Sequence, residues 1–174
     1  MTRRPPKTAA PVWHGHKTPG SLEPGQDLIT DPGCALCQAA LGPILFEGRF
    51  WRAVLNRNQS MLGKSFLATR RHVEDVSGLT GEEWSELLPL TWRVRAGVAA
   101  VFAPDHWNAA FLMNQDRHVH LHLFPRYASA REFGALRFDD PEFGKHYDPS
   151  RVVRLPEDIL STLAQRLRAA VASV

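Results

Sequence analysis

The stretch that decides the fold is Arg117-His118-Val119-His120-Leu121-His122-Leu123-Phe124-Pro125-Arg126. In a β-strand, alternate side chains share a face, so the three histidines project from one side of this segment. The intervening Val119, Leu121 and Leu123 then point into a core. Histidine is an uncommon residue, and a solvated strand face that carries three of them at a strict period of two is improbable by chance. The row therefore predicts a strand whose polar face has a function.

A catalytic metal site built from all three histidines is one interpretation of this row. Alternate residues lie about 6.6 Å apart along a strand, which puts the first and third about 13 Å apart. Zinc needs its nitrogen ligands at about 2.1 Å. One ion does not easily bind all three rings, so the spacing favours three neighbouring positions with different roles.

The rest of the chain mixes strand and helix patterns, which predicts an α+β fold. A capping box of Thr80 and Glu83 begins a long helix, in which Pro89 is expected to cause a kink. A last helix is expected from Pro156, with an acidic first turn and a leucine-rich face. A short helix is expected over 34–41, and five strands are expected at 44–47, 50–56, 65–69, 107–113 and 118–124, of which the first two and the last two form hairpins.

Length and composition indicate one packed domain with extensions. The chain has 174 residues, 44% of them hydrophobic, and a net charge of +3, which is too small to argue for nucleic acid or an anionic membrane. No apolar run approaches the roughly 18 residues of a membrane span, and the first 30 residues show no signal-like pattern. We expect a cytoplasmic protein with a flexible extension over 1–30, a folded domain over 31–130 and a C-terminal extension over 131–174. The aromatic residues of 131–155 are expected to cover either the site or a partner surface.

Cys34 and Cys37 are the only cysteines of the chain, which excludes a disulfide framework. A C-x-x-C pair is a moderate signal because it occurs as a zinc ligand set, a redox dithiol or two buried thiols. The redox interpretation needs a thioredoxin-like context, which the sequence does not show. In a reducing compartment, a metal site is the more typical use of such a pair.

The histidine row resembles the signature of the histidine triad (HIT) family, His-φ-His-φ-His-φ-φ, where φ is an apolar residue. The match over 118–124 is complete. The resemblance extends over about residues 31 to 127. It includes the following motifs: Asn56-Arg57, a turn at Gly63, Arg71-His72-Val73 and Pro125-Arg126. It implies an antiparallel sheet of about five strands with a long helix, and it makes 31–130 a nucleotide-binding domain.

Family members split a bond at the α-phosphate of a nucleotide through a nucleotidyl-histidine intermediate, and the resemblance implies the same chemistry here. An imidazole with a pKa near 6.5 is mostly neutral at pH 7 and attacks through a free nitrogen lone pair. His120, in the middle position, is the expected nucleophile. His122 is expected to contact the scissile phosphate and the leaving group, and because the uridylyltransferase branch has Gln at that position, it favours hydrolysis.

Hydrolysis of a dinucleoside polyphosphate is the expected activity. The alternatives are a nucleotidyl transferase or phosphorylase, and a non-catalytic nucleotide-binding module stabilised by zinc. A role on nucleic acid, such as removing a nucleotidyl cap from a DNA end, would require a basic surface that the net charge does not demand. No membrane partner is expected, and the family habit of pairing subunits implies a homodimer.

The resemblance also implies further site residues. In zinc-bearing members, the cysteine pair is joined by a histidine after the third strand and by the first triad histidine, which here are His72 and His118. Four such ligands make a structural zinc site. The residues that the resemblance implies for nucleotide binding are Asn56, which would contact the ribose, and Asn114, which would contact a phosphate. Gln115 is a weaker candidate for the phosphate contact. Turn formation remains an alternative for both asparagines. The loop before the triad is shorter than in many members, so a contact to the leaving group is expected from Arg117, Arg126 or the C-terminal segment.

Overall fold

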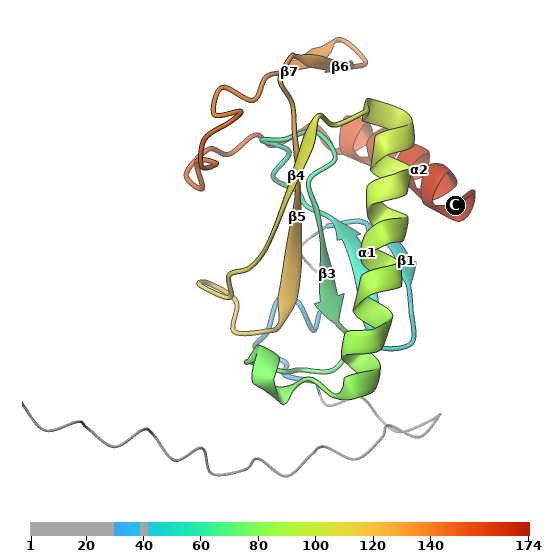
Figure 1. Ribbon diagram of the computed structural model, residues 1–174, viewed down its shortest axis with the longest axis vertical. Coiled ribbons are helices and arrows are strands. Elements are labelled where there is room, and N and C mark those ends of the chain that lie inside the picture. The colour runs from blue at the N-terminus through green and yellow to red at the C-terminus, as the bar shows by residue number, and fades with distance from the viewer. Residues whose placement is uncertain (1–29, 39–41) are drawn as a thin grey trace, which may run out of the picture.

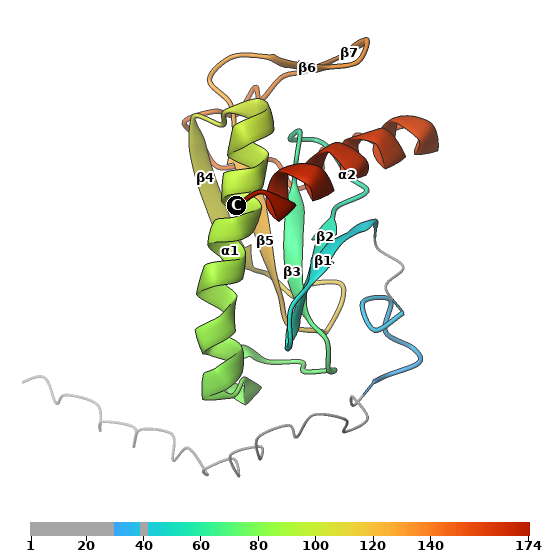
Figure 2. The ribbon, with the colours of Figure 1, turned by 90° about the vertical axis from the view of Figure 1, so that its right-hand side faces the viewer.

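The computed structural model describes residues 30–38 and 42–174 (Figures 1 and 2). Of the predicted flexible extension over 1–30, all but residue 30 lies outside the described residues, and so does the end of the short helix predicted over 34–41. Residues 35–38 form turns instead of that helix. The Asp31 side chain accepts a hydrogen bond from the N–H of Gly33 at 2.8 Å, and its carbonyl accepts one from the N–H of Cys34 at 3.1 Å. These contacts close a turn that directs both cysteines toward one point.

A five-stranded antiparallel sheet forms the centre of the molecule. Its strand order is β1-β2-β3-β5-β4, and β4 lies at one edge. The strands are β1 Ile44–Glu47, β2 Trp51–Leu55, β3 Ser65–Thr69, β4 His106–Phe111 and β5 His120–Arg126. The prediction of five strands and two hairpins is confirmed. β4 ends before the predicted residue 113, because Met113 adopts a positive φ of 41°, which an extended strand does not allow.

Two helices cover one face of the sheet (Figure 2). Helix α1, Gly81–Phe102, begins at the predicted capping box and includes Pro89 without ending there. Helix α2, Glu157–Ala172, begins after Pro156 as predicted. Alternate strand residues on this face pack with both helices in one hydrophobic core. None of the helices in the described part combines the length and the apolar character of a bilayer-spanning segment.

The opposite face of the sheet carries the histidines and is only partly covered. Cys34 and Leu36 pack there against Val54, Phe66 and Ala68 in a second, smaller cluster. The segment between 131 and 155 adds a two-stranded hairpin, β6 Arg131–Phe133 and β7 Leu136–Phe138, that the sequence patterns did not predict. After this hairpin the chain, orange in Figure 1, runs along the side of the sheet away from the helices before it enters α2. The candidate site lies on this histidine-bearing face of the sheet.

Candidate functional site

The three histidines lie at the start of β5, and only two of them belong to the strand. β5 begins at His120, and His118 sits at a bend just before it. Leu121 and Leu123 are buried in the core beneath the helices, as the alternation predicts. His120 and His122 therefore project together onto the opposite face, where the ring of Phe66 on β3 packs edge-on against both, at 5.9 and 6.1 Å between centroids.

His120 is held in one orientation and one tautomer. Its Nδ1 lies 2.6 Å from the carbonyl oxygen of His118, and a carbonyl only accepts, so Nδ1 carries the proton. The other nitrogen, Nε2, then has a free lone pair. Burial lowers the pKa of His120, partly opposed by the hydrogen bond to His118 and by the charge of Asp116, so the ring stays neutral. A neutral, oriented imidazole of this kind is competent as a nucleophile at phosphorus.

His122 is placed to donate a hydrogen bond to that lone pair of His120. Its Nε2 lies 2.9 Å from Nε2 of His120, and because the latter has no proton, His122 must be the donor. Burial, and to a smaller extent the electrostatic influence of His120 and Lys64, lowers the pKa of His122 to about 3. Its Nδ1 is buried with no hydrogen-bond partner among the described residues. The structure thus brings the two predicted catalytic residues together.

Cys34, Cys37, His72 and His118 converge on one point. One ligand atom from each lies within 4.8 Å of all the others. Nδ1 of His118 is 3.4 Å from Sγ of Cys34 and 3.5 Å from Sγ of Cys37, while Nδ1 of His72 is 3.4 Å from Sγ of Cys37. Two thiols and two imidazoles are a typical donor set for tetrahedral zinc.

The surroundings of His118 support the assignment of these atoms as metal ligands. Its Nε2 lies 2.8 Å from the carbonyl oxygen of Thr69 and therefore donates to it, which leaves the Nδ1 lone pair directed at the cysteines. Metal-bound histidines are oriented by a hydrogen bond of this kind. His118 is fully buried, and burial is the main cause that lowers its pKa to about 4, so the ring is neutral as a ligand must be. The four residues fit the expected structural zinc site.

The predicted nucleotide-binding residues lie at two separate places. Asn56 follows β2, and its Oδ1 accepts the N–H of Asn58 at 2.8 Å, which is the turn-forming role considered as its alternative. Asn114 does not directly follow β4, since that strand stops at Phe111 and not at the predicted residue 113. Asn114 and Gln115 are exposed in the loop between β4 and β5. No hydrogen bond within the described ranges involves their side chains, so their predicted role in binding phosphate stays a prediction.

An aromatic row that extends the triad is the main feature absent from the sequence prediction. Beyond His122, the ring of Phe124 stacks at 5.5 Å, and Tyr147 from the C-terminal segment stacks on Phe124 at 4.3 Å. His146 stacks on Tyr147 in turn, at 4.9 Å. Tyr147, from the 131–155 segment, thus packs at the end of the row formed by His122 and Phe124. The only signal in the sequence was an unusual density of aromatic residues among Gly and Asp.

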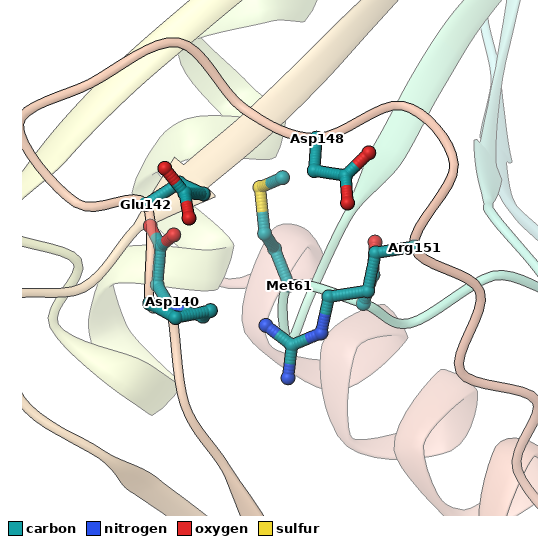
Figure 3. A pocket seen from close by; sticks show the side chains of 7 residues that line it. Met61, Asp140, Glu142, Asp148 and Arg151 are labelled. Carbon is teal, nitrogen blue, oxygen red and sulfur yellow. The ribbon is translucent and has the colours of Figure 1, made fainter.

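Arg126, one expected source of positive charge, is engaged elsewhere. Its guanidinium binds both carboxylate oxygens of Asp140, at 2.6 and 3.1 Å, and donates to Oδ1 of Asn108 at 2.9 Å. Asp140 also lines a small pocket between the loop after β2 and the C-terminal segment, seen in Figure 3. The labelled residues of this pocket are Met61, Asp140, Glu142, Asp148 and Arg151. None of them belongs to the triad. The contacts of Arg126 instead connect β5 to the C-terminal segment.

Comparison with known proteins supports the fold independently. No protein-family profile matches the chain, and no curated protein does. Among solved structures, a Hit-like protein involved in cell-cycle regulation from Bartonella henselae is 16% identical, covers 82% of this chain and 98% of its own, and has a TM-score of 0.61. A hypothetical histidine triad nucleotide-binding protein from Sulfolobus tokodaii is 15% identical over 80% of this chain and 89% of its own, with a TM-score of 0.60.

A third similar structure contains zinc. A zinc-bound histidine triad family protein from Mycobacterium smegmatis is 20% identical, covers 81% of this chain and 94% of its own, and has a TM-score of 0.54. In all three comparisons most of both chains superimposes, although few residues are identical. The overall arrangement of strands and helices therefore agrees with one known architecture. The chain has the fold of the histidine triad (HIT) proteins.

Proposed function

We propose that this protein hydrolyses a nucleotide conjugate, with a dinucleoside polyphosphate as the first candidate, through a covalent nucleotidyl-histidine at His120. The observation that supports the proposal is the proton arrangement of the row. Nδ1 of His120 donates to the carbonyl of His118 at 2.6 Å, and its Nε2 lone pair lies 2.9 Å from the donor on His122. A nucleophile and a hydrogen-bond donor are thus already adjacent on the sheet face away from the helices.

The proposed reaction proceeds in two balanced steps. In the first, Nε2 of His120 bonds to the α-phosphorus while the bond from phosphorus to the leaving oxygen breaks, and that oxygen departs as a phosphate anion that accepts a hydrogen bond from Nε2–H of His122. In the second, the oxygen of a water molecule bonds to phosphorus as the bond to His120 breaks, and the proton that this water loses passes to a phosphate oxygen of the product. The nucleoside monophosphate departs, and both rings return to their starting states. Throughout, the carbonyl of His118 holds the Nδ1 proton and stabilises positive charge on the substituted ring.

We propose that the four-ligand cluster binds zinc in a structural role. Bound zinc would supply a fixed connection between the turn at Cys34 and Cys37 and the entry to β5, and no reactive position would remain open on it. His118 is both a ligand and the residue whose carbonyl orients His120. Elemental analysis of the purified protein is expected to find one zinc per chain, and a Cys34→Ser, Cys37→Ser variant to find none. A wild-type chain without zinc would contradict this role.

Trapping of the intermediate is the direct test of the catalytic proposal. Wild-type protein incubated with a dinucleoside polyphosphate labelled at its α-phosphates and quenched in base is expected to carry an acid-labile adduct. His120→Ala should abolish both adduct and turnover while it retains nucleotide binding. His106→Ala, which removes an exposed histidine of β4, is the matched control and should behave as wild type. Binding without adduct or turnover in the wild type would indicate the non-catalytic module instead.

The acceptor in the second step separates hydrolase from transferase. Turnover in ¹⁸O-labelled water is expected to place one heavy oxygen in the monophosphate product. If orthophosphate replaced water as the acceptor, the product would be a nucleoside diphosphate without that label. This outcome would favour the phosphorylase alternative while leaving the role of His120 intact.

We further propose that two copies associate through α1 and the edge strand β4. Trp84, Leu88 and Trp92 recur every fourth residue on α1 and are 44%, 63% and 59% exposed. Trp84 also packs edge-on against Phe111 of β4 at 5.9 Å, so the apolar stripe continues onto the sheet edge. An exposed apolar stripe of this extent is typical of an interface. Sedimentation analysis is expected to show a dimer for the wild type and a monomer for Leu88→Lys, and a monomeric wild type would contradict the interface.

A further inference from the structure

Lys64 is a cation on the histidine face that the reaction above does not use. It immediately precedes β3, and Ser65 pairs with Leu123 of β5, so Lys64 lies across from Phe124. By the alternation of the strand, its side chain shares a face with Phe66, which packs against both catalytic rings. Its Nζ lies 5.4 Å from the centroid of the Phe124 ring. Lys64 therefore stands one position beyond His122 on the side where Phe124 lies.

The backbone at Lys64 is held firmly. The buried side chain of Gln59 donates from Nε2 to the Lys64 carbonyl at 2.9 Å and accepts the N–H of Gly63 at 2.8 Å. The N–H of Lys64 donates to the carbonyl of Met61 at 2.9 Å. Gly63 adopts a φ of 84°, which favours glycine, and so turns the chain into β3 at this point. The position of the Lys64 Cα relative to His122 is consequently part of the fold.

The charge of Lys64 has no counter-ion within the part of the chain that the structure describes. No carboxylate among residues 30–38 and 42–174 forms an ion pair with it, and its environment is half-buried. The charge of Lys64 nevertheless acts on His122 and helps to lower the pKa of that ring. Arg126, in contrast, is neutralised by Asp140, and Arg117 is exposed in a loop. A desolvated ammonium group without a counter-ion is costly unless an anion meets it.

We infer that Lys64 binds the anionic leaving group of the substrate and thereby selects phosphoanhydrides over phosphoramidates. This inference rests on the proposed function. With the α-phosphorus at Nε2 of His120 and the leaving oxygen at His122, the next phosphate of an oligophosphate chain continues toward Phe124 and meets Nζ of Lys64. The leaving side of a phosphoramidate is an amine, which offers no anion at that place. Lys64 thus supplies the charge that the short loop before the triad does not.

The test compares two substrates with the same nucleoside, a dinucleoside tetraphosphate and a nucleoside phosphoramidate. Lys64→Met is expected to lower kcat/KM about 100-fold for the tetraphosphate, the scale of losing one charged contact to developing phosphate charge. For the phosphoramidate the loss should stay below about threefold, because the chemistry at the α-phosphorus is unchanged. Lys64→Arg should retain most of the activity on the tetraphosphate. Lys145→Met, which removes an exposed charge elsewhere, should leave both substrates unaffected.

The outcomes separate this inference from the proposed function. Equal losses on both substrates, or no loss on the tetraphosphate, would overturn the role of Lys64 while the labelled adduct on His120 still formed. A wild-type protein that splits neither substrate and forms no adduct would overturn the proposed function itself. If Lys64→Met does not fold, Lys64→Gln removes the same charge with a polar end, and the same ratio between the two substrates decides.

Discussion

Glu83 connects the start of α1 to the residue beside a predicted metal ligand. Its carboxylate accepts hydrogen bonds from Nε and Nη2 of Arg71, at 2.6 and 2.8 Å, and from the N–H of Thr80 at 2.7 Å. The Glu83 side chain is 1% exposed and that of Arg71 is 10% exposed. Burial raises the pKa of Glu83, but the hydrogen bonds from Arg71 and Thr80 and the charge of Arg71 outweigh it and lower the pKa overall. The carboxylate therefore stays ionised inside the protein.

Glu83→Gln keeps the shape of this side chain but removes its charge. The guanidinium of Arg71 would then be buried without its counter-ion, which costs about 3–5 kcal/mol when one partner of a buried pair is lost. The glutamine oxygen still accepts one of the hydrogen bonds, so we expect the lower end, about 3 kcal/mol. Because a domain is stabilised by only about 5–15 kcal/mol in total, the variant should unfold far more easily than wild type.

Urea unfolding followed by tryptophan fluorescence measures this difference. The matched control is Glu82→Gln, whose carboxylate is 47% exposed and contacts Arg49 at 3.3 Å. Exposed pairs of this kind contribute about 0–1 kcal/mol, so the control should stay close to wild type. The double variant Arg71→Met, Glu83→Gln should cost less than the sum of the two single changes, because no unpaired charge remains. If Glu83→Gln lost no more free energy of unfolding than the control, the reasoning about a buried pair would be refuted.

Three further predictions concern packing, metal and pH. Gly97→Ala places a Cβ 2.4 Å from Cγ1 of Val171 between α1 and α2, so we expect it to lower the free energy of unfolding by about 1–3 kcal/mol despite the better helix propensity of alanine. The control is Gly81→Ala, whose Cβ meets no atom within 4 Å. Equal thermal midpoints for the two variants would contradict this prediction. A strong zinc chelator should lower the thermal midpoint of wild type and leave that of Cys34→Ser unchanged, whereas an unaffected wild type would argue against a structural metal. Burial lowers the pKa of His122 from 6.5 to about 3, so below pH 6.5 the unfolded protein binds a proton at His122 that the folded protein does not bind. The free energy of unfolding should therefore fall as the pH drops below 6.5. His122→Asn should flatten that slope, and an unchanged slope would contradict the buried neutral ring.

Local rules were enough to predict most of the elements. The Thr80–Glu83 capping box and the acidic turn after Pro156 each begin a helix where the sequence predicts it. The alternation after His118 predicts which residues of β5 enter the core. These features depend on neighbours within a few residues, and the period of a strand or helix is a property of the backbone itself. The short helix predicted over 34–41 was wrong for 35–38, because the turn at Asp31 and the approach of Cys34 and Cys37 to distant histidines decide that segment.

The site was predictable in its members and much less in its arrangement. The period of two predicted that His120 and His122 share a face, and the resemblance to the histidine triad family implied their roles. The proton on Nδ1 of His120, in contrast, follows from a carbonyl that only the bend at His118 brings within 2.6 Å. The strand predicted over 107–113 is present but stops at Phe111, because the positive φ of Met113 is incompatible with an extended strand.

What the sequence by itself determined is therefore the α+β pattern, the position of the histidine row and the types of ligand for a metal, all of which depend on residue chemistry and short periods. Only the tertiary structure decided how they are used. It neutralised Arg126 with Asp140, stacked Tyr147 at the end of the row and left Lys64 beside His122 with no counter-ion among the described residues. The physical reason is that burial, charge pairing and proton position depend on residues brought together from distant parts of the chain, and no local pattern specifies those contacts.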